Sequence, residues 1–234
     1  LGGARPKASV IDENGRLMIA KFPSPHDEWN IPLWEYIAYR LAERAGLRIP
    51  RARLEKIGTS YVLLLERFDR IENSRIPFAS AMTLLGAQDG ENRSYLELAE
   101  ILQRDGSHPS KDLLELWKRM VFNILIANVD DHLRNHGFLR DENGWRLSPV
   151  YDLEATPATH KERILHTFIT ESDGTADLEL ALSVASYFGL SPREAKNEIA
   201  AMQKVVSEWE KLARRLGAGK HEIDTMHSAF CMPA

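Results

Sequence analysis

The densest group of chemically versatile side chains is the stretch Asp130 to Asn135, which holds two aspartates, a histidine, an arginine and an asparagine. It directly follows an apolar run, where polar groups are costly to place without a purpose. Asp130 and Asn135 have the D-x-x-x-x-N spacing of a kinase catalytic loop, in which Asp accepts the proton of the substrate hydroxyl and Asn binds magnesium. Asp152, seventeen residues after Asn135, follows a short apolar segment and is suitably placed to bind the same metal. These residues predict phosphoryl transfer.

Other interpretations of this stretch remain open. It could be the solvated end of a helix, because an Asp and an Asn five residues apart often occur by chance. Asp131 is a rival for the proton acceptor, although it lies one residue too close to Asn135 for the kinase spacing. His132 and His136 could bind zinc, but no third His or Cys lies nearby in the sequence. The choice depends on whether the chain supplies the other parts of a kinase site in the correct order.

Length and composition suit one large globular domain or two small lobes. The chain has 234 residues, of which 44% are hydrophobic and 27% charged. Its net charge of −4 gives no general attraction to nucleic acid or to an anionic membrane. The single cysteine, Cys231, excludes an internal disulfide and fits a reducing compartment. With neither a signal peptide nor a membrane-spanning apolar run, we expect a cytoplasmic protein, and the first residue, Leu1, indicates a processed, trimmed or truncated product.

Residues 1–70 predict a β-rich unit that begins with a loop suited to anions. Gly2 and Gly3 allow successive backbone N–H groups to face one anion, and Arg5 and Lys7 add positive charge. Two hairpins are predicted, one over residues 8–22 around an ENG turn and one over residues 52–65 around an IGTS turn.

Two charged residues lie within otherwise apolar elements of this unit. Lys21, in the second strand of the first hairpin, either extends to the surface or pairs with an acid or a phosphate. Glu35 lies on an amphipathic helix predicted over residues 31–47, where it could orient Lys21 as a helix Glu does in kinases. The second hairpin runs into the charged loop Glu66 to Phe68, at the place where a kinase has the hinge that binds adenine. The alternative is a strand that simply ends in a polar loop.

After residue 70 the pattern becomes helical. Helices are predicted over residues 94–104, over 110–128 with Ser110 as N-cap, over 178–188, and over 191–216 after an SPRE capping box. A hairpin over residues 137–147 lies between Asn135 and Asp152, like the small strand pair that carries a kinase's metal-binding acid. The order of elements predicts an α+β, two-lobed, protein-kinase-like fold. Its β-rich nucleotide-binding lobe is residues 1–70, with the hinge at its end, and its mostly helical catalytic lobe is residues 71–234.

In these stretches the chain resembles the HipA family of bacterial serine/threonine kinases, the toxins of HipBA-type toxin–antitoxin pairs. The similar stretches are GGARPKA, IAKFPS, LLERFDR, FNILIANVDDHLRNHGF and LSPVYDL. The resemblance implies ATP and magnesium as the nucleotide and metal, Asp130 as catalytic base, and Asn135 and Asp152 as metal ligands. It also implies that the following residues contact ATP: Gly2, Gly3, Ala4, Lys7, Lys21, Glu66, Arg67, Phe68, His132 and Tyr151, together with Asn135 and Asp152.

The resemblance further implies partners and marks two departures. Family members bind a HipB-like DNA-binding antitoxin and phosphorylate aminoacyl-tRNA synthetases, which halts translation. They usually carry a further subdomain before the Gly-rich loop, and a serine that is autophosphorylated just before it, and neither is in this sequence. Two rival functions are a small-molecule kinase of similar fold and a non-catalytic toxin–antitoxin or repressor subunit. The negative net charge argues against direct binding of nucleic acid.

Overall fold

The computed structural model describes residues 5–71 and 74–230. It begins with a four-stranded antiparallel sheet of order β1-β2-β4-β3, formed by β1 (Lys7–Ile11), β2 (Leu17–Lys21), β3 (Ala52–Ile57) and β4 (Ser60–Glu66). Both predicted hairpins are confirmed, and their turns contain Gly15 and Gly58 at positive φ angles of 76° and 62°, which glycine adopts readily. The pairing of β2 with β4 places Lys21 opposite Leu63, inside the sheet.

Helix α1 (Ile31–Arg44) packs on this sheet and carries Glu35. The side chain of Asn30 accepts a hydrogen bond from the Leu33 N–H and so caps the helix N-terminus. The helix ends at Arg44 rather than at the predicted Leu47, because Gly46 turns the chain with a φ of 77°. Its apolar stripe is fully buried, which fixes the rotation of the helix and hence the direction of Glu35.

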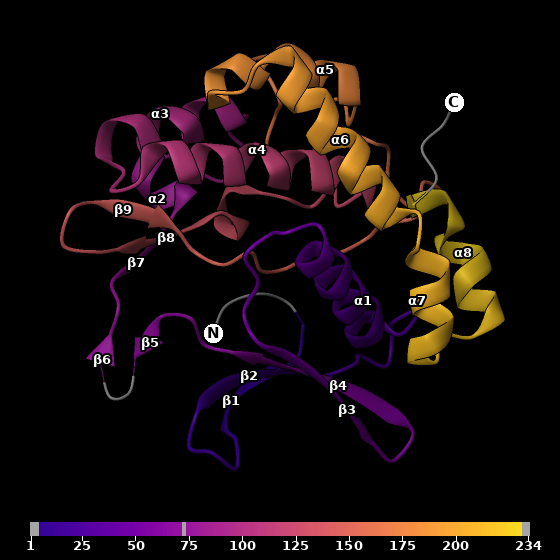
Figure 1. Ribbon diagram of the computed structural model, residues 1–234. Coiled ribbons are helices and arrows are strands. Elements are labelled where there is room, and N and C mark those ends of the chain that lie inside the picture. Colours follow the sequence, from indigo (N-terminus) through magenta and orange to yellow (C-terminus); the bar gives the residue numbers. More distant parts are fainter. Residues whose placement is uncertain (1–4, 72–73, 231–234) are drawn as a thin grey trace.

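Two C-terminal helices, α7 (Trp209–Leu216) and α8 (Lys220–Phe230), lie beside α1 (Figure 1). The ring of Trp34 lies 6.1 Å from the ring of Trp209 and 6.1 Å from that of Phe230. The backbone N–H of Asn30 donates to the carboxylate of Glu222 at 2.7 Å. The end of the chain therefore helps to hold the helix that carries Glu35.

The remaining helices assemble around α4 (Pro109–Leu125), which is buried along most of its length. It packs against α3 (Tyr95–Asp105), α5 (Leu178–Ser183) and α6 (Pro192–Val206). The predicted capping box at Ser191 and Glu194 is confirmed. The buried indole of Trp117 donates to the carbonyl of Ala181 at 2.9 Å, which satisfies its one polar group.

The boundaries of three further predicted helices are wrong. Helix α4 begins at Pro109 after His108 rather than with Ser110 as N-cap, and it ends at Leu125 rather than Asn128, because Ala127 turns the chain with a φ of 49°. The element predicted over 178–188 is two helices, α5 and a 3-10 helix η2 (Ala185–Phe188). The helix predicted over 191–216 is also two, α6 and α7; α6 ends at Val206, and the hydroxyl of Ser207 donates to the Lys204 carbonyl. In both cases the apolar periodicity continues across the break.

Short elements connect the sheet to the helices. They are β5 (Arg70–Ile71), β6 (Ser74–Arg75), β7 (Phe78–Ser80), α2 (Ala81–Leu85), the 3-10 helix η1 (Leu133–Asn135), β8 (Gly137–Arg140) and β9 (Trp145–Leu147). The hairpin predicted over residues 137–147 is confirmed as β8 and β9. Strand β7 adds a third strand to it by pairing with β8, which places Phe78 opposite Leu139.

The chain is thus a mixed α/β protein with antiparallel sheets and helices. Figure 1 shows β1 to β4 and α1 on one side and α2 to α6 on the other, with the β7–β8–β9 sheet beside the helices. Among the described residues, no helix combines the length and the apolar character needed to cross a membrane.

Candidate active site

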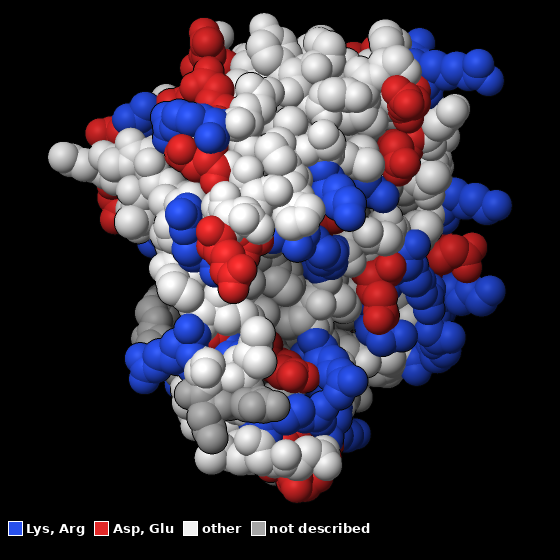
Figure 2. Space-filling model, turned by 60° about the vertical axis from the view of Figure 1, so that its left-hand side comes forward, with Lys and Arg blue, Asp and Glu red and all other residues white. Residues whose placement is uncertain are grey.

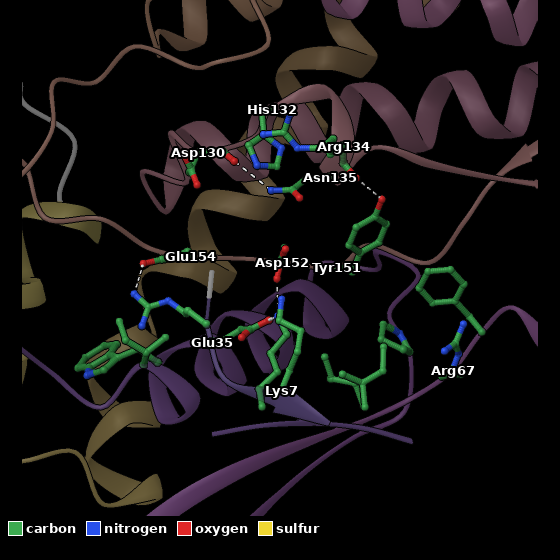
Figure 3. Close-up of a pocket in the computed structure, with 18 of the residues that line it drawn as sticks. Lys7, Glu35, Arg67, Asp130, His132, Arg134, Asn135, Tyr151, Asp152 and Glu154 are labelled. Atoms are coloured by element: carbon green, nitrogen blue, oxygen red, sulfur yellow. Dashed lines mark hydrogen bonds and ion pairs between the residues drawn. The ribbon is translucent and has the colours of Figure 1, made fainter. Parts of the chain in front are cut away.

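A cavity of about 870 Å³ lies between the β1–β4 sheet with α1 and the segment that follows α4. Every predicted site residue that the structure describes lines it: Lys7, Lys21, Glu66, Arg67, Phe68, Asp130, His132, Asn135, Tyr151 and Asp152. The predictions for Gly2, Gly3 and Ala4 lie outside the described residues. Figure 3 shows Asp130, His132 and Asn135 on one wall and Lys7 and Glu35 on the opposite wall, with Asp152 between them. Residues far apart in the sequence therefore share one cavity.

The end of α4 positions Asp130 and Asn135. The amide of Asn128 donates to the side-chain oxygen of Asn123 at 3.0 Å, and its backbone N–H donates to the carbonyl of the same residue at 2.9 Å. The chain then reaches η1, where the amide of Asn135 donates to the backbone oxygen of Asp130 at 3.0 Å. The Asp130 carboxylate is about half exposed, and the Lys161 ammonium lies 3.2 Å from it. This geometry leaves the Asp130 carboxylate accessible to a ligand in the cavity.

Asp131, the rival for the proton acceptor, faces the opposite way. It is 1% exposed, and its carboxylate accepts a hydrogen bond from the Tyr95 hydroxyl at 2.7 Å and one from the His166 N–H at 2.8 Å. Burial raises the pKa of Asp131 to about 7, although these donors lower it. A carboxylate enclosed in this way has no access to a hydroxyl in the cavity.

His132 and His136, whose spacing could suit zinc, lie in different surroundings. His132 lines the cavity, and within the described part of the chain its buried Nδ1 has no hydrogen-bond partner. His136 is buried below it, where its Nε2 contacts the backbone oxygen of Asp131 at 3.0 Å. Burial lowers the pKa of His136 to about 3, so its ring is neutral. Among residues 5–71 and 74–230, no group of three His, Cys, Asp or Glu side chains could hold a metal ion by itself.

Lys21 pairs with two carboxylates at the centre of the cavity. Its ammonium lies 2.5 Å from Glu35 and also contacts Asp152. Burial raises the pKa of Glu35 to about 7, and Lys21 opposes this shift. For Lys21, burial favours the neutral amine, but Glu35 and Asp152 outweigh it and raise the lysine pKa. For Asp152, burial is likewise outweighed by Lys21, which lowers the pKa of that carboxyl. Lys21 is therefore a charged residue held inside, and the interpretation that it extends to the surface is wrong.

Asp152 and Asn135 offer oxygen ligands of the kind that magnesium prefers. The Asn135 amide nitrogen is engaged by Asp130, which leaves its oxygen as the atom for a ligand. Asp152 has a positive φ of 58°, an uncommon conformation for a residue with a side chain. Such conformations persist where the surroundings impose them, often at functional sites.

An aromatic group lies where β4 leaves the sheet. The ring of Phe68 lies 5.7 Å from that of Tyr151 and 6.2 Å from that of Phe78. The N–H groups of Glu66 and Arg67 are bonded to the carbonyls of Arg51 and Leu17, at 2.9 and 3.0 Å. This end of the cavity therefore offers flat apolar surfaces next to backbone polar groups, an environment that suits a heteroaromatic base.

The sequence did not reveal several residues of the cavity. Phe78 and His166 line it, yet each belongs to an irregular or short segment without a motif. Arg5, which the sequence predicts to add positive charge to the loop suited to anions, also lines the cavity, but it pairs with Asp27 at 2.5 Å and Glu154 at 3.4 Å, so its charge is largely balanced. Only the apolar character of Phe78 in a turn-rich segment was a signal, and it does not specify a role.

The surface carries both signs of charge. Figure 2 shows Lys and Arg side chains interspersed with Asp and Glu over much of one face. At the cavity, Arg67 pairs with Asp69 at 2.6 Å, and Arg134 contacts Asp89. Paired charges of this kind give little attraction to a polyanion.

Comparison with known proteins finds similar sequences and similar folds. A family model described as the HipA-like C-terminal domain matches residues 1–209. Y4mE of Sinorhizobium fredii, named as a candidate kinase, is 28% identical over 185 residues, which are 68% of this chain and 42% of Y4mE. The serine/threonine-protein kinase CtkA of Helicobacter pylori is 24% identical over 163 residues, which are 64% of this chain and 50% of CtkA.

Two solved structures share the fold. One is the complex of HipA, HipB and operator DNA from the toxin–antitoxin system of Shewanella oneidensis MR-1. It matches with a TM-score of 0.74 at 18% identity, over 98% of this chain and 62% of the matched chain. The other is the Helicobacter pylori proinflammatory kinase CtkA, with a TM-score of 0.63 at 17% identity, over 98% of this chain and 92% of that one. The chain spans 42% of Y4mE and 62% of the chain in the HipA complex. Because the family model covers most of its length, this chain belongs to the HipA-like C-terminal domain family.

Proposed function

We propose that this protein is an ATP- and magnesium-dependent serine/threonine kinase of the HipA type. One observation carries the proposal: Asp130, Asn135 and Asp152 share a cavity with the buried pair of Lys21 and Glu35. These are the groups that a protein kinase uses for phosphoryl transfer. The proposal includes a two-lobed, kinase-like organisation, with residues 1–70 as nucleotide-binding lobe and hinge and residues 71–234 as catalytic lobe.

In this proposal Asp130 accepts the proton of the acceptor hydroxyl. The Asn135 amide fixes the main chain at Asp130 by donating to its backbone oxygen, and the Asp130 carboxylate is about half exposed beside Lys161, so it can meet a substrate without a large rearrangement. Asp131 is not the base, because both of its oxygens are enclosed.

Asn135 and Asp152 would bind magnesium through their side-chain oxygens. Bound magnesium would neutralise charge on the transferred phosphoryl group. In the structure Asp152 contacts Lys21 instead, so binding of the nucleotide requires Lys21 to turn from Asp152 to the phosphates while it keeps Glu35. Lys7 adds a second cation to the same wall. From the family resemblance alone, Gly2, Gly3 and Ala4 would also contact the phosphates, and His132 would contact the nucleotide from the opposite wall.

Adenine would bind at the hinge, residues 66–68. Phe68 and Tyr151 supply flat surfaces, and the hinge backbone supplies polar groups for the adenine edge. Because the amides of Glu66 and Arg67 already bond within the protein, we assign the adenine contact to the Phe68 N–H and the hinge carbonyls. Arg67 borders the site while it is paired with Asp69.

The proposed partners follow from the family. One solved structure similar to this chain is a complex that contains HipA, HipB and operator DNA, which supports a HipB-like DNA-binding antitoxin as partner. We propose a translation component, such as an aminoacyl-tRNA synthetase, as substrate, and hence a cytoplasmic location. The mixed surface charge supports an indirect connection to DNA through the antitoxin rather than direct binding by this chain.

Labelled ATP, magnesium and a bacterial lysate test the proposal, with Asp130→Asn as control. A labelled protein band that disappears in the variant is the expected result. A labelled metabolite would instead identify a small-molecule kinase. No label with either preparation, although the protein is folded, would leave a non-catalytic toxin–antitoxin or repressor subunit and refute the kinase proposal.

A further inference from the structure

The carboxylate of Asp131 accepts three hydrogen bonds beside the cavity, and the proposed chemistry does not use it. One carboxylate oxygen accepts the backbone N–H groups of His166, at 2.8 Å, and Thr167, at 3.2 Å. The other accepts the Tyr95 hydroxyl at 2.7 Å. Its backbone oxygen accepts the Thr167 hydroxyl at 2.6 Å. The residue next to the proposed base is thus tied to a segment 35 residues further along the chain.

That segment forms part of the cavity wall. His166 lines the cavity together with Asp130, and its ring lies 5.9 Å from that of His132, nearly perpendicular to it. The next residues are held from the other side by α3: Phe168 N–H donates to the Arg93 carbonyl and Tyr95 N–H to the Phe168 carbonyl, both at 2.8 Å. Residues 166–168 therefore lie between Asp131 and the start of α3.

The Asp131 carboxylate acts only as a hydrogen-bond acceptor. All three partners of the Asp131 carboxylate donate, and they come from α3 and from two successive residues of the segment. A buried carboxylate is costly unless its donors stay in place. Displacement of residues 166–167 would remove two donors at once and leave the carboxylate poorly satisfied. The arrangement thus favours one position of the segment relative to the loop that carries Asp130.

We propose that Asp131 is a positioning residue, which fixes the His166 wall at a set distance from Asp130 so that the acceptor hydroxyl is held at the base. This inference rests on the proposed kinase function. It predicts that loss of the Asp131 bonds lowers the transfer rate far more than the nucleotide affinity, because the hinge and Lys21, which bind the nucleotide in the proposal, are not among its partners, and the segment meets the nucleotide site, among the described residues, only through the ring of His132.

Asp131→Asn tests it with little change of shape. The variant amide oxygen can still meet the two backbone donors, but as a weaker, neutral acceptor. Asp112→Asn is the matched control, because Asp112 is also 1% exposed and bonded, to Arg48 at 2.7 Å and to the Leu147 N–H at 3.2 Å, but has no contact with the cavity. Tyr95→Phe removes one donor and leaves the two backbone bonds.

Phosphate transfer to myelin basic protein, used as a general acceptor, and ATP affinity are measured for each variant. A misplacement of about 1 Å costs on the order of 100-fold in rate. We therefore expect Asp131→Asn to lower the transfer rate at saturating ATP by about 10- to 100-fold, with ATP affinity within about twofold of wild type. Tyr95→Phe should give a smaller loss. Asp112→Asn should lower thermal stability and keep the rate.

Hydrogen exchange gives a readout that does not need activity. In Asp131→Asn the amides of His166 and Thr167 should exchange at least about tenfold faster than in wild type, while those of α4 stay protected. Unchanged exchange at both amides overturns the proposal, even if wild type transfers no phosphate. If wild type transfers no phosphate but the two amides exchange faster in Asp131→Asn, the kinase assignment fails, while the role of Asp131 in holding residues 166–167 is retained. An active Asp130→Asn beside an inactive Asp131→Asn would make Asp131 the base and overturn the positioning role.

Discussion

The substitution Lys21→Met tests two proposed roles of this lysine, its contact with the ATP phosphates and its stabilisation of the Glu35 carboxylate. The methionine keeps an aliphatic stem of similar length and removes the charge. In the proposed function, Lys21 contacts the phosphates of ATP, and a charge-assisted contact contributes about 1.5–3 kcal/mol. Because Lys21 contacts Asp152 before the nucleotide binds, part of that gain is offset by the pair it gives up. We therefore expect a loss at the lower end of this range, about 1.5 kcal/mol, which is roughly tenfold in ATP affinity.

The same change affects stability in a way that depends on pH. Without Lys21, the carboxylate of Glu35 is buried next to Asp152 and has lost its paired cation, so its pKa rises above the value of about 7 that it has in the wild type. A group with a raised folded pKa favours the folded state while it is protonated, and this contribution is lost as the pH rises from the unfolded pKa to the folded one. Between these values stability falls by up to about 1.4 kcal/mol per pH unit. Wild type leaves this range near pH 7, whereas the variant should continue to lose stability above it.

The assay has two parts. ATP and adenosine affinities are measured by titration, and the free energy of unfolding is measured at pH 6 and pH 8, about one pH unit on either side of neutrality. Adenosine has no phosphates and should bind both forms alike through the hinge. The double variant Lys21→Met with Glu35→Gln is the control: it should recover stability at the higher pH and keep the weak ATP affinity. Equal losses for ATP and adenosine would mean general damage to the sheet. Unchanged affinity for both would refute the phosphate contact, and a pH-independent stability loss would refute the argument about Glu35.

Three further substitutions test other parts of the cavity. Asp130→Asn should lose about two orders of magnitude in transfer rate and keep its fold and its ATP affinity, because only proton acceptance is removed; normal activity would exclude Asp130 as base. Asp152→Ala should abolish the effect of magnesium on nucleotide affinity in titrations with and without the metal, and an undiminished effect would contradict its role as ligand. Phe78→Ala removes one face of the aromatic group at the hinge and should weaken adenosine binding by about 0.5–1.5 kcal/mol without affecting the response to magnesium; calorimetry that finds unchanged adenosine affinity would show that this ring does not contact the base.

Turn residues, helix caps and apolar periodicity predicted those parts of the fold that depend on interactions between residues close in sequence. The hairpins around Gly15 and Gly58, the helix that carries Glu35 and the capping box at Ser191 all follow from turn chemistry and periodicity. The gathering of Lys21, Asp130, Asn135 and Asp152 could be predicted only because their order along the chain matched a known arrangement. Their individual roles remain predictions.

What the sequence could not indicate depends on contacts between distant residues. The end of α4 at Leu125 follows from the turn at Ala127, which is set by how the next residues pack. Strand β7 exists because it pairs with β8, about 60 residues away, and so Phe78 reaches the cavity. The partners of Asp131 likewise come from α3 and from residues 166–167, which have no sequence signal of their own.

The packing of Trp34 against Trp209 and Phe230 has a consequence for differences within the family. The family model ends at residue 209, so α8 and almost all of α7 lie beyond the matched region, yet they hold the helix that carries Glu35. Coupling free energies are reciprocal: if ATP binding fixes α1 through Lys21 and Glu35, ATP must also protect α8 from exchange, and tighter packing of α8 must strengthen ATP binding by the same factor. Relatives with identical cavity residues can therefore differ in nucleotide affinity through their C-terminal sequences alone, and substitutions selected there would change that affinity without altering any residue of the cavity.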